Sequence, residues 1–99
     1  MAEIETIFLD GHKMLNRRAV HDHLMEQLEL PEYYGRNLDA LYDLLTERDG
    51  PTRLVVQHKD TVLSWLGEYG VALCQTLEDA DRANPGLEVL FPEDESSCK

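Results

Sequence analysis

Three short segments rich in leucine, β-branched and aromatic residues predict strands, and two segments with helical features separate each from the next. The predicted strands are residues 4–9, 53–57 and 87–91. The predicted helices are residues 17–29, 38–46, 60–66 and 71–83. Strands joined by helical crossovers pair in parallel, with right-handed connections. The sequence therefore predicts an α/β fold with a three-stranded parallel sheet and about four surrounding helices.

Polar residues and glycines mark where the predicted helices begin and end. Asn37 precedes the second predicted helix and Asp60 opens the third, and both side chains can accept hydrogen bonds from a first helical turn. Gly67 and Gly70 are expected to bracket a break before the last helix, because glycine adopts backbone angles that helices exclude. Trp65 has a large apolar ring that we expect in the core.

The length of 99 residues is enough for one small domain but not for two. We assign residues 1–92 to this domain and residues 93–99 to a polar, acidic C-terminal tail. No apolar run approaches the roughly 20 residues of a membrane-spanning helix, and the first residues do not resemble a secretory signal. Two cysteines, Cys74 and Cys98, are too few for a disulfide framework. These features predict a cytoplasmic protein with free thiols.

The charge balance is strongly acidic, because 9 basic and 20 acidic side chains give a formal net charge of −11. Such a field repels the phosphates of nucleic acids and anionic lipids, so we expect binding to neither nucleic acid nor membrane. The basic residues Arg17, Arg18 and Arg48 are isolated along the chain and form no nucleic-acid patch. The same field attracts a basic protein. The simpler alternative is that the charge serves solubility alone.

The second predicted helix combines an apolar stripe with a compact polar face. At about 100° per residue, the stripe expected to face the core contains Leu38, Leu41 and Leu45. The residues that fan out on another side are Asp39, Tyr42, Asp43 and Thr46. Tyr33 and Tyr34 lie just upstream, beside Gly35. Aromatic side chains next to a rigid acidic face are typical of a protein interface, although an ordinary solvated face has the same composition.

An enzymatic interpretation would rest on three carboxylates, Asp39, Asp43 and Asp79, holding a divalent metal for hydrolysis. The sequence contains no HExxH motif, no glycine-rich phosphate loop and no GxSxG nucleophile motif. The four histidines are expected to have structural roles, with His12 and His58 standing alone. We therefore predict a protein that is not an enzyme, with no catalytic residues, no metal site and no cofactor.

The stretch LPEYYGRNLDALYD, residues 30–43, resembles the barstar family, the intracellular inhibitors of barnase-type ribonucleases. The order of predicted strands and helices also fits that family along nearly the whole chain. The resemblance implies a barstar-like three-stranded parallel sheet surrounded by helices. It also implies a binding protein whose second helix and preceding loop plug a ribonuclease active site, where acidic groups take the place of the RNA phosphates.

The resemblance implies a set of partner-binding positions and one energetic anchor. The matching positions are Tyr33, Asn37, Leu38, Asp39, Ala40, Asp43 and Thr46, with Tyr42 where the family has a tryptophan. Asp43 corresponds to the carboxylate that enters the phosphate site. Asp79 aligns with a contact glutamate of the family, and Glu47–Asp49 stand where a second tryptophan is expected.

The expected partner is a basic secreted ribonuclease, which an immunity protein of this type would block inside the cell before export. We expect no catalysis by the inhibitor itself and a monomer when it is free. The altered aromatic residues leave one alternative within the same class of binding protein, namely a barstar-like module for a different basic protein or toxin.

Overall fold

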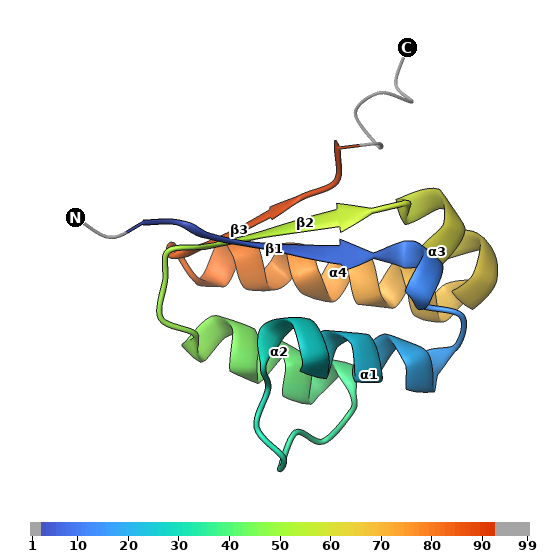
Figure 1. Ribbon diagram of the computed structural model, residues 1–99, viewed down its shortest axis with the longest axis horizontal. Helices are drawn as coiled ribbons and strands as arrows, with labels where there is room; N and C mark the ends of the chain where they lie inside the picture. The colour runs from blue at the N-terminus through green and yellow to red at the C-terminus, as the bar shows by residue number, and fades with distance from the viewer. Residues whose placement is uncertain (1–2, 93–99) are drawn as a thin grey trace.

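The computed structural model describes residues 3–92. The elements follow in the order β1 (Glu5–Asp10), η1 (Gly11–Lys13, a 3-10 helix), α1 (Arg17–Leu28), α2 (Leu38–Glu47), β2 (Thr52–Gln57), α3 (Lys59–Leu66), α4 (Glu68–Ala83) and β3 (Leu87–Leu90) (Figure 1). Within these residues no helix is long and apolar enough to cross a lipid bilayer. The predicted tail and Cys98 lie outside the described residues.

The three strands form one parallel sheet in the order β1-β2-β3. In the register of the sheet, Ile7 lies beside Leu54 and Leu54 beside Val89. Because all three strands run in the same direction, every connection must cross back along the molecule, and helices supply these crossovers. The predicted fold class is therefore confirmed.

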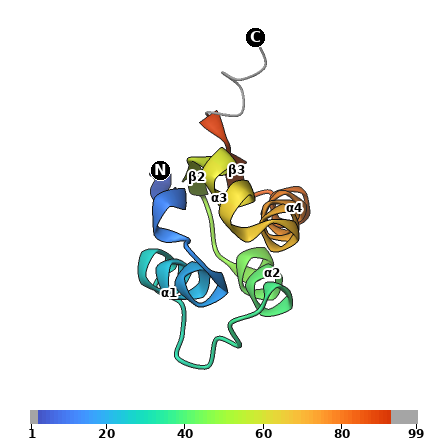
Figure 2. The same cartoon turned by 90° about the vertical axis from the view of Figure 1, so that its right-hand side faces the viewer.

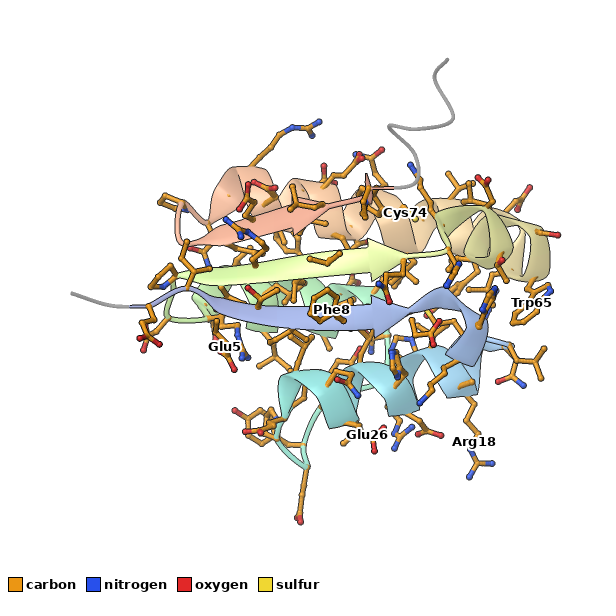
Figure 3. All side chains as sticks on the ribbon, turned by 45° about the horizontal axis from the view of Figure 1, so that its top comes forward. Glu5, Phe8, Arg18, Glu26, Trp65 and Cys74 are labelled. Carbon is orange, nitrogen blue, oxygen red and sulfur yellow. The ribbon has the colours of Figure 1, made fainter. Side chains whose placement is uncertain are left out.

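Helices α1, α2 and α4 lie on one side of the sheet, and the loop between α1 and α2 projects away from it (Figure 1, Figure 2). Strand side chains alternate between the two faces of a sheet. The residues facing the helices are buried and are Ile7, Leu9, Leu54, Val56 and Leu87. On the opposite face the Phe8 side chain remains half exposed (Figure 3). The core therefore lies between one face of the sheet and the helices.

Two expectations about the third helix are wrong. Trp65 is 46% exposed, because α3 lies at the carboxyl end of the sheet and buries Val62 instead of the indole (Figure 3). Asp60 is not the cap of this helix. His58 occupies the N-cap position in a left-handed backbone conformation (φ 61°, ψ 47°), and no side chain there makes a capping hydrogen bond.

The predicted break between Gly67 and Gly70 is a single turn at Gly67, whose φ is 59°. Gly70 lies inside α4 and is buried. A Cβ atom at Gly70 would come within 2.8 Å of the carbonyl oxygen of Val62. Glycine is therefore required at position 70 by the close packing of α4 on α3 and not by a change in chain direction.

Candidate protein-binding site

Helix α2 presents one face to the core and another to solvent, as its sequence period predicts. Leu41 and Leu45 are completely buried, whereas Asp39 and Asp43 are exposed. Leu38 is only half buried, so it lies at the edge of the apolar stripe. Within residues 3–92 neither aspartate carboxylate forms an ion pair or a hydrogen bond. Both carboxylates are therefore available to a binding partner.

The start of α2 is held by Asn37, as predicted. The Asn37 side-chain oxygen accepts a hydrogen bond from the Ala40 amide at 2.7 Å, and its amide nitrogen donates to the Gly35 carbonyl at 3.2 Å. A side-chain cap of this kind satisfies an amide that has no partner within the helix. The first turn, which carries Asp39, is therefore preorganised.

The end of α2 is held by Asn84, a buried residue that directly follows α4. Its amide nitrogen donates to the carbonyl oxygens of Leu45, at 2.9 Å, and Arg48, at 3.0 Å. Its side-chain oxygen accepts from the Gly86 amide at 2.9 Å. Asn84 thus connects the end of α4 to the end of α2, which pack side by side. Only the tertiary structure reveals this role, because 36 or more residues separate Asn84 from the two carbonyls.

The two adjacent tyrosines of the loop have different environments. Tyr33 is 82% exposed, whereas Tyr34 is buried. The Tyr34 hydroxyl lies 2.6 Å from His21 Nδ1, and the Tyr69 hydroxyl lies 2.5 Å from His21 Nε2. A neutral imidazole has one donor and one acceptor nitrogen, so one hydroxyl donates to the ring and the other accepts from it. The buried Tyr34 therefore anchors the loop that presents Tyr33 to solvent.

The remaining predicted contact residues surround the two aspartates on α2, with one exception on α4. Ala40, Tyr42 and Thr46 are half buried, and the Thr46 hydroxyl donates to the Asp43 carbonyl at 3.0 Å. Asp79 lies on α4, the helix beside α2. Its carboxylate accepts hydrogen bonds from Gln75 at 3.0 Å and Arg82 at 3.1 Å. The Asp79 carboxylate is thus already partly compensated by its own helix, unlike those of Asp39 and Asp43.

A basic pocket of about 690 Å³ borders the acidic face, and it corrects the expectation that the arginines at positions 17 and 18 are isolated. Its lining residues are Arg17, Arg18, His21, Arg36, Asn37, Leu38, Asp39 and Tyr69. The Arg36 guanidinium pairs with Asp22, and the Arg17 guanidinium lies 4.4 Å from the centre of the Tyr69 ring. The beginnings of α1, α2 and α4 bring these residues together. The candidate surface therefore has an acidic part and a basic edge.

Arg48 is likewise not isolated, because its guanidinium donates to the Leu28 carbonyl at 3.2 Å and to Glu5 at 3.3 Å. The side chain therefore connects the end of α2 to α1 and β1 and turns inward. Arg48 lies in the stretch Glu47–Asp49, where the family resemblance implies a second tryptophan. None of the three described residues Glu47–Asp49 therefore supplies an aromatic anchor.

Two buried histidines of α1 have lowered pKa values. Burial is the main cause of the low pKa of His21, and the nearby Arg36 charge adds to it. Burial also lowers the pKa of His23, with a smaller contribution from Lys13. The Asp10 backbone amide donates to His23 Nε2 at 2.9 Å, which requires that nitrogen to be unprotonated. Protonation of His23 would break this connection between β1 and α1.

The free energy of unfolding should therefore fall as the pH drops below about 6.5, the ordinary pKa of histidine. Below that pH, His21 and His23 become protonated in the unfolded chain while they stay neutral in the folded protein. Their contribution to the free energy of unfolding is therefore fully present above the pKa of the unfolded histidines, and it is lost as the pH falls towards the lower pKa values of the folded protein. Urea unfolding at several pH values should show this trend. His23→Gln should flatten this trend, and a slope in that variant equal to that of the unmodified chain would contradict the assignment.

The geometry defines a small α/β protein in which a capped helix exposes two aspartates, and the loop before it exposes a tyrosine. The sequence profile described as Barstar (barnase inhibitor) matches residues 4–91. The Bacillus subtilis (strain 168) protein named "Putative ribonuclease inhibitor YrdF" is 39% identical over 75 residues, which cover 75% of this chain and 82% of that protein. The chain therefore belongs to the barstar family of ribonuclease inhibitors. Proteins of this family are inhibitors and not enzymes.

Proposed function

We propose that the acidic face of α2 and the loop before it occlude the active site of a barnase-type ribonuclease. The observation that carries the proposal is the exposure of Asp39 and Asp43, unpaired within residues 3–92, on a helix whose other side is buried. The carboxylates would lie against the arginine, lysine and histidine side chains that otherwise bind RNA phosphates. Inhibition would then be competitive with RNA.

The rigidity of α2 favours tight binding. Asn37 holds its first turn and Asn84 its last, so little conformational entropy is lost when a partner docks. The carboxylates must lose water in the complex, and the cations of a phosphate-binding site compensate for that loss. Tyr33 supplies an exposed aromatic ring beside them. We place this binding event in the cytoplasm and assign a monomer as the free form.

Steady-state inhibition kinetics against small secreted ribonucleases test the proposal. With a barnase-type enzyme, the chain should raise the apparent KM for RNA and leave kcat unchanged. Inhibition with kcat lowered and KM unchanged would contradict occlusion. The alternative target, a different basic protein or toxin, is favoured by Tyr42 and by the inward-turned Arg48. A pull-down with the intact chain and with the Asp39→Ala/Asp43→Ala double variant identifies a target that the acidic face retains. An assay of the retained protein for RNA cleavage then distinguishes that alternative from a ribonuclease.

Association should slow steeply as salt is added. A protein with a net charge of −11 attracts a basic enzyme over long distances, and mobile ions screen this attraction. We expect the association rate constant to fall at least about tenfold between about 20 and about 500 mM NaCl. The dissociation rate constant should change much less. Stopped-flow measurements provide both constants, and an association rate that is insensitive to salt would exclude electrostatic steering.

A further inference from the structure

A cluster of two histidines and one aspartate lies at the carboxyl end of the sheet and shares no residue with the surface assigned to the ribonuclease. Asp10 is the last residue of β1, His12 belongs to η1, and His58 directly follows β2. In the parallel register Asp10 lies beside Gln57, the residue before His58. The pairing of β1 with β2 therefore brings these segments together, although they are distant in sequence. The expectation that His12 and His58 stand alone is wrong.

The three side chains are arranged closely enough to share one ion. The His12 and His58 rings stack with their centres 3.8 Å apart and their planes 12° apart. One ligand atom from each of Asp10, His12 and His58 lies within 4.8 Å of the other two. Nitrogen and oxygen ligands bind Zn²⁺ at about 2.0–2.2 Å, so the donors of one ion are about 3–4 Å apart. Because the nitrogen lone pairs lie in the plane of each imidazole, the two rings must turn out of their stack to point at one ion, and the exposed His12 side chain has room to turn.

The backbone around the cluster holds the two histidine-bearing segments in close contact. A Cβ atom at Gly11 would lie 2.6 Å from the His58 carbonyl oxygen and 2.7 Å from that of Gln57. The Asp10 carboxylate accepts a hydrogen bond from the His12 amide at 2.9 Å, which orients it towards η1. The neighbouring Lys59 ammonium group lies over the Phe91 ring, at 4.6 Å from its centre.

We propose that Asp10, His12 and His58 form a binding site for a divalent transition-metal ion such as Zn²⁺. The ligands are two imidazole nitrogens and one carboxylate oxygen. Imidazole selects zinc, nickel and copper over magnesium and calcium, which prefer oxygen ligands throughout. Three protein ligands also leave a coordination position for water or for a group from a partner. The acidic charge of the whole chain favours the approach of a cation.

The position of Trp65 provides a direct readout. It is the single tryptophan of the chain, and its ring centre lies 6.2 Å from that of His12. Ni²⁺ bound at the cluster should quench its fluorescence, and Zn²⁺ should restore the emission by displacing Ni²⁺. Calorimetric titration of untagged protein with Zn²⁺ alone should show saturable binding of one ion per chain.

Matched variants decide the assignment. His12→Gln and His58→Gln should each weaken Zn²⁺ binding at least about tenfold, the smallest loss expected when a residue of a metal site is removed. Asp49→Asn removes an exposed carboxylate before β2, at the other end of that strand, and should have no effect. Circular dichroism checks that each variant is folded. The proposal fails if the unmodified chain shows no saturable binding, if both histidine variants bind normally, or if Cys98→Ser alone abolishes binding. None of these outcomes depends on ribonuclease inhibition.

Discussion

Replacement of Asp43 by alanine is expected to weaken ribonuclease binding by more than about 2 kcal/mol, or at least about 30-fold in Kd. Asp43 lies on the solvent face of α2, between the exposed Asp39 and the half-buried Thr46. In the proposed complex its carboxylate takes the position of an RNA phosphate among the cations of the enzyme. Its removal would leave those cations in contact with a methyl group inside a closed interface, without an anion to compensate them.

A matched variant separates this local effect from the general loss of charge. Glu26→Ala also removes one negative charge, but Glu26 projects from α1, outside the surface assigned to the partner (Figure 3). Calorimetry of both variants against the same ribonuclease should give a large loss for Asp43→Ala and a small one for Glu26→Ala. Similar small losses for both would show that Asp43 contributes only to long-range attraction, and no loss for Asp43→Ala would remove it from the interface.

Replacement of Asn84 by alanine is expected to lower the free energy of unfolding by about 3 kcal/mol, since each of its three hydrogen bonds contributes about 1 kcal/mol. The variant loses the two bonds that hold the carbonyls of Leu45 and Arg48 and the one that holds the Gly86 amide. These backbone groups are buried or partly buried, so water cannot easily provide the hydrogen bonds that the Asn84 side chain makes to them. Urea denaturation at neutral pH measures the change.

Asn16→Ala is the control for this experiment. Asn16 caps α1 by accepting a hydrogen bond from the Ala19 amide at 2.9 Å, and loss of such an exposed cap costs about 1 kcal/mol. Both variants should remain folded in the absence of urea. Asn84→Ala should also weaken ribonuclease binding, because the end of α2 is released, whereas Asn16→Ala should not. If the two variants lose the same small stability, Asn84 does not hold α2 in place.

Local sequence patterns were enough to predict the strands, the helices and the direction of the acidic face. Leu41 and Leu45 are four residues apart and therefore lie on one side of any helix, so the side that carries Asp39 and Asp43 follows from the helical period alone. Asn37 was predictable for the same reason, because it caps a turn that begins one residue later. The parallel sheet followed from the helices between its strands.

Contacts between distant segments depended on the tertiary structure. The stacking of His12 on His58 requires the register of β1 and β2, and the pocket with Arg17 and Arg36 requires three helices and the loop before α2 to meet. Trp65 is exposed because α3 lies at the end of the sheet and not over its face. The sequence by itself determined which side chains each element turns towards the core, since that depends on a local repeat. The contacts between elements are determined only when the whole core packs. Each such contact is stabilised by the interaction of two segments, and the sequence of one segment does not reveal it.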